Sequence, residues 1–518
     1  MKSQSLNIFG RIGLFLTVFI TGASVMVIEL LGTRLIAPFY GASLYVWSSL
    51  ISVTMIALAI GYYLGGRWTD YTQRIGLSLI IALAGLLTLI IPWVTGPVLL
   101  LTDPLGLRAG AFFSALILFS PSLTFLGMVG PFAIKLATAR LEGIGNSVGS
   151  IYAVSTMGSV IGTLVLGFFL FPLVGSREIL MGLGLILMLL ALIVAFYEQK
   201  KLAVGSALLP CFLLAMTGLV LIPKIMDAKP LDTGINKGYQ VLSEQESLYG
   251  WVRVIDKPAQ DLRLLASDAS VIGASDISDG ESRLSYQDIV GLIPALTPKM
   301  TRALIVGQGA GHMVKILSDR YGIKTDTLEI DPAVAAAANH YFGFKATGQT
   351  IIGDARYEIR HLQGPYDLII HDCFTGGSEP AHLLTTETLA QLKGLLSEKG
   401  ILAVNFVAFE KGEHSDALAS VAKTIAEVFP EQKTFISEPG KNFNDFILLA
   451  SRNPIEIDST TLLPEQTAWL QKRLLTVDKD KGVVLTDNLN PIEHLQTAKA
   501  EYYRHFIVDW LGPELLVR

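Results

Sequence analysis

The sequence predicts two kinds of domain in one chain: a multi-span α-helical membrane domain followed by an α/β domain. Three observations support this prediction. Long apolar runs fill residues 12–223, the composition beyond Lys224 is that of an ordinary globular protein, and apolar strands alternate with amphipathic helices after Pro298. Hydrophobic residues make up 51% of the 518 residues and charged residues only 16%, against about 25% charged in a typical soluble domain.

The N-terminal part contains apolar segments long enough to cross a bilayer. A spanning helix needs about 20 mostly apolar residues, because lipid offers no hydrogen-bond partners to an open backbone. Seven segments meet this length: 12–33, 43–65, 75–100, 110–134, 147–174, 178–197 and 202–223. The first is too long, and followed too closely by others, to be a cleaved signal peptide. We therefore expect a multi-pass protein of the cell membrane, with the lipid bilayer as a partner.

Small residues recur within two of these segments and favour close packing of helices. The glycines concerned are Gly61 and Gly65 in the second segment with Gly66 directly after it, and Gly149, Gly158, Gly162 and Gly167 in the fifth.

The orientation in the membrane follows from the loop charges, because short cytoplasmic loops are enriched in Lys and Arg. With the N-terminus inside, the cytoplasmic segments carry Lys2, Arg11, Arg67, Arg74, Lys135, Arg140, Lys200 and Lys201, and the opposite loops carry Arg34, Arg108 and Arg177. This bias favours a cytoplasmic N-terminus, and seven spans then place the soluble part outside. The nucleotide chemistry argued below requires a cytoplasmic soluble part, so the side of the membrane stays open.

Charge and cysteine content exclude several classes of protein. The formal net charge of −5 gives no reason to expect a nucleic-acid partner. The only two cysteines, Cys211 and Cys373, make a disulfide framework implausible. No metal site is expected, because His312 and His371 lack the spacing of metal ligands.

The chain divides into four regions on these patterns. Residues 1–223 form the membrane domain, and the polar stretch 224–238, with Pro and Gly, is a linker. Residues 239–283 alternate apolar and polar, which predicts a small antiparallel β-domain of two or three strands. A Rossmann-like domain occupies 284–518 and begins with a helix over 285–296.

Five apolar strands separated by helices define the Rossmann-like domain. They are ALIVG (303–307), TDTLEI (325–330), QTII (349–352), DLIIHD (367–372) and ILAVNF (401–406). Apolar strands that alternate with amphipathic helices predict a parallel sheet covered on both faces. Ligands of such sheets bind beyond the carboxyl ends of the strands, where the strand order reverses.

Four features fall at those strand ends. A glycine-rich loop, Gly307 to Gly311, follows the first strand and opens a helix, where glycines let the backbone approach a ligand closely. Glu329 closes the second strand, about 20 residues on, at a suitable place for ribose hydroxyls. Asp354 follows the third strand, and Asp372 closes the fourth. Together they predict a site for an adenosine-containing cosubstrate.

Residues 239–451 resemble the spermidine synthase (polyamine aminopropyltransferase) family. The matching stretches are VLSEQESLYGWVRV, SYQDIV, LIVGQGAGHMVKIL, TLEIDPAV, GDARYEI and YDLIIHDCFTGGSEPAHLLTTETL. The whole chain is similar to the membrane-fused form of that family, in which a multi-span segment precedes the synthase-like domain. The resemblance implies a class I methyltransferase fold with an N-terminal β-domain, and a transferase that uses decarboxylated S-adenosylmethionine or S-adenosylmethionine itself.

The resemblance also implies roles for individual residues. Gly307, Gln308, Gly309 and Gly311 would face the sulfonium side of the cosubstrate, Glu329 would bind the ribose, Asp354 with Ala355 would bind the adenine, Asp372 would be catalytic, and Tyr286 and Asp288 would line the amine channel.

The sequence departs from the family motifs at two positions. The glycine loop of the family carries an aspartate where this chain has Ala310, and the acid three residues beyond the catalytic aspartate is replaced by Thr375. Both acids hold cationic groups in the family, so the nucleotide half of the site is intact and the amine half is depleted.

Three functions remain open at this point. The first is aminopropyl transfer from decarboxylated S-adenosylmethionine to a small-molecule amine. The second is methyl transfer from S-adenosylmethionine, which the loss of the acid at Ala310 favours because a methionine carboxylate would no longer meet a negative charge. The third is a transporter or membrane scaffold with a nucleotide-sensing domain. The acceptor is not identified, and a homo-oligomer is suggested by the resemblance alone.

Overall fold

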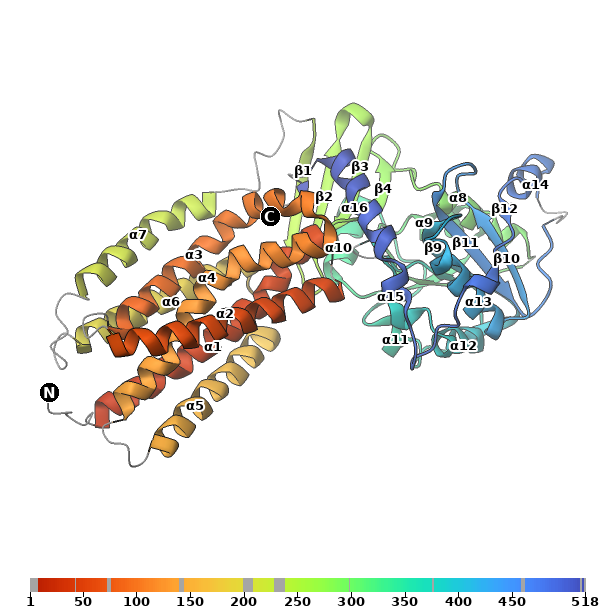
Figure 1. Cartoon of the computed structure of the whole chain (residues 1–518). Helices are drawn as coiled ribbons and strands as arrows, with labels where there is room; N and C mark the ends of the chain where they lie inside the picture. Colours follow the sequence, from red (N-terminus) through yellow and green to blue (C-terminus); the bar gives the residue numbers. More distant parts are fainter. Residues whose placement is uncertain are drawn as a thin grey trace. The chain divides into compact units, whose positions relative to one another are not determined.

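The computed structural model describes ten stretches of the chain: residues 8–41, 43–71, 76–138, 144–198, 208–227, 238–297, 299–374, 377–457, 462–512 and 515–516. The chain forms two compact units (Figure 1). One comprises Met1–Asp232 with Leu511–Arg518, and the other comprises Thr233–Trp510.

The first unit is built from long apolar helices. They are α1 (Ile8–Tyr40), α2 (Leu44–Tyr71), α3 (Leu77–Thr102), η1 (Asp103–Leu105), α4 (Gly106–Ala137), α5 (Ile144–Val165) with its π-helical continuation η2 (Leu166–Leu170), α6 (Ser176–Tyr197) and α7 (Leu208–Asp227). By length and composition, five described segments are able to cross a membrane: Gly10–Tyr40, Leu44–Asp70, Leu77–Ala137, Ile144–Leu170 and Ser176–Tyr197. A shorter apolar helix covers Leu208–Ile222.

These five segments differ from the seven expected ones at two places. Leu77–Ala137 counts once but holds both α3 and α4. Hydrogen bonds join Thr88 to Ser122 (2.7 Å) and Thr102 to Ser114 (2.5 Å), so the two helices run antiparallel and pack side by side. The segment expected at 202–223 begins outside the described residues, and its described apolar part is shorter than the other helices.

Some of the glycines predicted to allow close packing lie at helix–helix contacts. A β-carbon added at Gly158 of α5 would collide with the main chain of Phe19 in α1, and one added at Gly61 of α2 would collide with the main chain of Thr124 in α4. A β-carbon at Gly149 or Gly167 would meet open space. The packing prediction therefore holds for only part of the set.

The second unit begins with a four-stranded antiparallel sheet in the order β1-β2-β3-β4. Its strands are β1 (Gln240–Glu246), β2 (Trp251–Lys257), β3 (Leu262–Ser267) and β4 (Ser270–Asp276), with the 3-10 turn η4 (Pro258–Gln260) between β2 and β3. The sequence predicted two or three strands here. Val252, Val254 and Leu265 pack against Ala310 and Val334 of the larger sheet domain, so one apolar cluster joins the two sheets.

The larger sheet has eight strands in the order β12-β10-β11-β9-β8-β5-β6-β7. They are β5 (Arg302–Val306), β6 (Lys324–Glu329), β7 (Thr350–Ile352), β8 (Tyr366–His371), β9 (Leu396–Phe409), β10 (Glu431–Ile436), β11 (Phe443–Ser451) and β12 (Leu474–Leu475). The chain runs from β5 to β7 on one side and then returns to β8 and β9 on the other. The strand order therefore reverses between β5 and β8, which is where a ligand site is expected.

Helices cover both faces of this sheet, as predicted (Figure 1). They are α8 (Tyr286–Val290), η5 (Ile293–Ala295), α9 (His312–Tyr321), α10 (Pro332–Tyr341), α11 (Ala355–Glu358), η6 (Ala381–Leu383), α12 (Thr386–Leu395), α13 (Asp416–Val428), α14 (Pro464–Gln471), η7 (Lys479–Lys481), α15 (Ile492–Leu495) and α16 (Thr497–Leu511). Alternate residues of β5 enter opposite cores: Leu304 and Val306 pack on one face, Ala303 and Ile305 on the other.

Three predictions about this unit need correction. The five predicted strands, β5 to β9, pair in parallel, but the sheet as a whole is mixed, because β11 pairs antiparallel with both β9 and β10. The helix expected over 285–296 ends at Val290, and Pro294 lies in the separate 3-10 turn η5. The linker expected at 224–238 starts later, since α7 continues to Asp227, and residues 228–237 lie outside the described part.

Candidate active site

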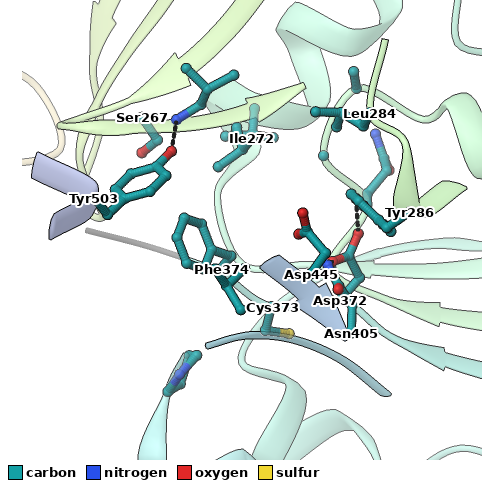
Figure 2. A pocket seen from close by; sticks show the side chains of 18 of the residues that line it. Ser267, Ile272, Leu284, Tyr286, Asp372, Cys373, Phe374, Asn405, Asp445 and Tyr503 are labelled. Atoms are coloured by element: carbon teal, nitrogen blue, oxygen red, sulfur yellow. Dashed lines mark hydrogen bonds between the residues drawn. The ribbon is translucent and has the colours of Figure 1, made fainter. Parts of the chain in front are cut away.

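A cavity of about 660 Å³ opens at the carboxyl ends of β5, β6 and β8 (Figure 2). Its lining comes from the glycine loop, from the ends of these strands, from β4, from β11 and from α16. The cavity therefore lies at the reversal of strand order, where the sequence placed its candidate residues.

The glycine loop is held between β4 and the end of β8. Gly307 has φ of +96°, and an added β-carbon would collide with the main-chain oxygen of Asp372. Gly309 has φ of +53°, and its added β-carbon would lie 2.8 Å from the main-chain oxygen of Ile272. Only glycine fits both conformations without strain. The loop consequently presents bare backbone to the cavity.

Glu329 closes β6 beneath this loop. Its Oε2 accepts a hydrogen bond from the Gly309 amide (3.3 Å), and its Oε1 accepts one from the Asp331 amide (3.0 Å). Burial raises the pKa of Glu329 to about 7, against the opposing effect of these amide hydrogen bonds. Asp331 also borders the cavity and accepts a hydrogen bond from the Ser247 hydroxyl (2.6 Å).

Asp354 stands at the start of α11, on the same side of the cavity as Glu329. Its Oδ1 accepts a hydrogen bond from the Arg356 amide (2.7 Å), which caps the short helix. Ala355 lines the cavity next to it. Asp354 can cap the helix with Oδ1 and still face a ligand with Oδ2, because Oδ2 has no hydrogen bond to another described residue.

Asp372 directly follows β8 and lies at the centre of the cavity wall. The Tyr286 hydroxyl donates to its Oδ2 (2.6 Å), and Asn405 Nδ2 donates to its Oδ1 (2.8 Å), as Figure 2 shows for Tyr286. Burial raises the pKa of this carboxyl, and the two hydrogen bonds oppose the rise. The side chain is thus fixed in orientation and biased toward accepting a proton.

Another carboxylate, which the sequence analysis did not single out, faces the same cavity from β11. Asp445 pairs with Val407 of β9 in the sheet register, and Figure 2 shows it close to Asp372. Burial first, and then the charges of Asp372, Glu379 and Glu438, raise the pKa of Asp445 to about 7. Glu438 itself also lines the cavity and forms an ion pair with Lys441.

Aromatic side chains of α16 close the cavity on the opposite side. Tyr502, Tyr503, Phe506 and Trp510 all line it. The Tyr503 hydroxyl accepts a hydrogen bond from the Val271 amide (3.0 Å), and its ring packs on Phe374 with centroids 5.0 Å apart. The spacing of residues 502, 506 and 510 is a helical i, i+4 pattern, which was the available signal in the sequence.

Most of the predicted site residues meet at this cavity. Gly307, Gln308, Gly309, Tyr286, Glu329, Asp354, Ala355 and Asp372 line it. Two predicted residues do not. Gly311 begins α9, and its β-carbon position is filled by Phe344. Asp288 is exposed and lies outside the cavity lining, in which its neighbour Gln287 takes part.

Of the two positions that depart from the family motifs, the structure describes one. Ala310 is 4% exposed and lies under β4, where a β-carbon at Gly273 would come within 2.5 Å of it. Thr375 lies outside the described residues. Asp445 and Glu438 bring to the cavity two acids that the sequence did not predict, while the two family acids remain replaced by Ala310 and Thr375.

Comparison with known proteins decides the family. The chain is 32% identical over 245 residues to the polyamine aminopropyltransferase of Vibrio vulnificus, covering 76% of that protein and 45% of this chain. The chain belongs to the polyamine aminopropyltransferase family. The protein is therefore a transferase. Its apolar helices precede an α/β domain of the Rossmann-like class.

A second protein similar in sequence and one solved structure are also similar to this member of the aminopropyltransferase family. The N-terminal histidine N-methyltransferase of Emericella nidulans is 26% identical over 386 residues, covering 68% of this chain and 67% of that protein. A probable spermidine synthase from Corynebacterium glutamicum, solved by crystallography, has 18% identity and a TM-score of 0.38, and covers 43% of this chain and 83% of its own. No family model matches the chain.

Proposed function

We propose that the protein transfers an aminopropyl group from decarboxylated S-adenosylmethionine to a small cationic amine. The observation that carries this proposal is Asp372, a buried carboxylate oriented by Tyr286 and Asn405 beside the glycine loop. A carboxylate with a raised pKa in this position suits the acceptance of a proton from an attacking amine.

The donor would occupy the side of the cavity formed by β5, β6 and α11. The bare backbone of Gly307, Gln308 and Gly309 leaves room for the sulfonium end of the donor. Glu329 offers its carboxylate to the ribose hydroxyls, and Asp354 with Ala355 borders the place of the adenine. These assignments follow the order of the strand ends, which is the order of ligand contacts in sheets of this kind.

The transfer is a single displacement. The free-base nitrogen of the acceptor attacks the aminopropyl carbon attached to sulfur, so a C–N bond forms as the C–S bond breaks. The C–S electron pair stays on sulfur and methylthioadenosine leaves as a neutral thioether. The nitrogen that has become cationic loses its proton to Asp372 and then to water. Alignment of nitrogen, carbon and sulfur by the walls of the cavity supplies much of the rate enhancement.

A product assay tests this function. Full-length protein in detergent is offered decarboxylated S-adenosylmethionine and S-adenosylmethionine together with putrescine, cadaverine and spermidine, and the products are identified by mass spectrometry. We expect methylthioadenosine and an aminopropylated amine in equal amounts. Asp372→Asn keeps the shape of the site and is expected to lower kcat by about 10²- to 10⁴-fold. Absence of any methylthioadenosine from wild-type protein would contradict the proposal.

Methyl transfer from S-adenosylmethionine is the second candidate. Ala310 puts no negative charge near the glycine loop, so a donor that carries a carboxylate is not repelled there. The similarity to the histidine N-methyltransferase covers 68% of this chain, more than the α/β unit Thr233–Trp510 alone, and therefore extends into the helical unit. In the same assay this function would yield S-adenosylhomocysteine and a methylated amine in place of methylthioadenosine.

The helical unit supports a location in the membrane. Five described segments have the length and hydropathy of spanning helices. We propose that this unit anchors the enzyme in the lipid bilayer as a multi-pass protein, with the α/β unit outside the hydrocarbon region.

A further inference from the structure

Six acidic residues line the cavity, and they differ in their hydrogen-bond and ion-pair partners. The six are Glu329, Asp331, Asp354, Asp372, Glu438 and Asp445. The first four accept hydrogen bonds from amides or side chains of the protein, and Glu438 forms an ion pair with Lys441. In the part of the chain that the structure describes, the carboxylate of Asp445 has no hydrogen bond or ion pair. Asp445 is therefore a carboxyl group without a partner among the described residues, beside an open volume.

Two lysines of this region, Lys441 and Lys499, are already paired with other acids. Lys441 pairs with Glu438, and the buried Lys499 pairs with Glu379 behind the cavity wall. Glu379 Oε1 also accepts a hydrogen bond from the Val407 amide (2.9 Å), next to Asp445 in the register. Neither lysine forms an ion pair with Asp445. The charge of Lys499 lowers the pKa of Asp445, but burial and the charges of the neighbouring acids outweigh it and raise the pKa to about 7. A cation supplied from outside the protein would relieve this repulsion.

The sheet fixes the relation between Asp445 and Asp372. Asp372 follows β8, Asn405 lies on the next strand β9, and Asp445 lies on β11 beyond it. Asn405 is opposite Ile447 and Asp445 is opposite Val407, so two strand spacings and an offset of two residues put the backbones of Asp372 and Asp445 roughly 12 Å apart. Both side chains line the cavity, so the gap between the two carboxylates is on the order of this backbone separation or less. A flexible acceptor with two separated cationic nitrogens matches that gap.

The wall between these acids and α16 suits an alkyl chain with a positive end. Phe443 and Tyr502 line the cavity with ring centroids 4.6 Å apart, and Phe374, which follows β8, also lines it. Aromatic faces pack against methylene groups and attract ammonium ions by cation–π interaction.

We propose that Asp445 determines acceptor specificity by binding the far ammonium group of a diamine whose reacting nitrogen lies at Asp372. This inference rests on the proposed function, because it assigns the second end of the acceptor in the same site. It predicts a preference for diamines over monoamines of equal length, carried by a residue on β11.

The experiment compares putrescine with butylamine, which has the same carbon chain and lacks the second nitrogen. Initial rates are measured on full-length protein at saturating decarboxylated S-adenosylmethionine. We expect Asp445→Asn to raise the KM for putrescine about 10- to 100-fold with little change in kcat, because it removes one charge-assisted contact to the bound amine. The KM for butylamine should stay the same. Asp445→Glu keeps the charge and should retain most of the preference for putrescine.

The matched control is Asp319→Asn, which neutralises an exposed acid on α9 away from the cavity. It should change neither KM, and the melting temperatures of all variants report whether they are folded. An unchanged KM for putrescine in folded Asp445→Asn protein would overturn the inference and leave the proposed function intact.

A binding measurement separates the two proposals. Putrescine is titrated calorimetrically into wild-type and Asp445→Asn protein saturated with methylthioadenosine. If wild-type protein transfers no aminopropyl group to any amine, the proposed function fails. Asp445 then still stands as a diamine-binding residue if wild-type protein binds putrescine and the variant has lost at least tenfold in affinity. Equal affinities, or no binding to wild-type protein, would overturn it.

Discussion

At the scale of single residues, the proton-accepting capacity of Asp372 depends on what surrounds it. Each of its oxygens accepts one hydrogen bond, from Tyr286 and from Asn405, and each keeps a lone pair for an incoming amine. Burial raises its pKa, while the two donors stabilise the carboxylate and oppose that rise. The balance between burial and hydrogen bonding therefore sets the lower end of the pH range in which the residue is a base.

Removing the hydroxyl of Tyr286 tests this balance. In Tyr286→Phe the carboxylate loses one stabilising donor, so the pKa of Asp372 rises further. As the pH is lowered, Asp372 is then protonated, and activity lost, at a higher pH than in the wild type. We expect the acidic limb of the kcat/KM profile to move up by about one unit, with kcat above that limb within about threefold of wild type. Tyr321→Phe removes a hydroxyl at the end of α9 that donates to the Gly291 carbonyl outside the cavity lining, and it should leave the limb in place. A downward shift would contradict the assignment of Asp372 as the base.

The candidate residues at strand ends were predictable, and those inside strands were not. Glu329, Asp354 and Asp372 interrupt apolar runs, so each marks the end of a strand in the sequence. Asp445 and Asn405 lie within β11 and β9, and their approach to the cavity depends on the antiparallel register of these strands. No local pattern encodes that register, because it is set by tertiary pairing.

Restoring the family's acid at residue 310 provides a second test at this scale. Ala310 is buried in the apolar cluster with Val252, Leu265 and Val334, and its β-carbon faces Gly273. Ala310→Asp should destabilise the protein by about 1–3 kcal/mol, because a charged group replaces a methyl group in a tight apolar contact. Ala336→Asp, at an exposed site on α10, should cost less than about 1 kcal/mol. Thermal unfolding of both variants gives the comparison, and equal stability would show that the β-domain yields at this contact.

At the scale of elements, the departures from prediction have identifiable causes. The alternation of strands and helices predicted a parallel sheet, which is correct for β5 to β9, whereas β10 and β11 follow one another with no helix between them and pair antiparallel. The expected helix over 285–296 ends early because Pro294 supplies no amide hydrogen, and the chain turns into η5. The β5–α9–β6–α10 segment has strong apolar periodicity and short loops, and it was located within one residue at its strands.

The loop between β5 and α9 is the element on which the site depends most. An added methyl group at Gly307 collides with the main chain of Asp372, and φ of +96° is strained for any other residue. Gly307→Ala should therefore displace Asp372 or the loop and lower transfer by at least about 100-fold. Gly322 also has positive φ, +67°, but open space around it, so Gly322→Ala should cost about 1 kcal/mol and leave kcat unchanged. Equal activity of the two variants would contradict this role for the loop.

At the scale of the whole molecule, the two units have very different relations to solvent. The α/β unit buries its own apolar cores on both faces of the sheet. The helical unit exposes large apolar side chains along its length, among them Met55, Tyr63 and Phe168. An exposed apolar surface of this kind is stable in lipid rather than in water. Similarity to the histidine N-methyltransferase extends beyond the α/β unit into this helical unit.

The number of spans fixes a property of the whole chain that can be measured directly. The described helices α1 to α7 correspond to the seven expected segments, since α3 and α4 are two antiparallel helices within Leu77–Ala137. An odd number of crossings puts the N-terminus and the α/β unit on opposite sides of the bilayer. We expect epitope tags at the two ends of the chain to show opposite protease accessibility in sealed vesicles of known orientation. Tags on the same side would mean that one helix does not cross, and α7 is the first candidate because its apolar part, Leu208–Ile222, is the shortest. With opposite sides established, the side of the N-terminus decides between the loop-charge bias, which places it in the cytoplasm, and the demand of the proposed donor for a cytoplasmic α/β unit.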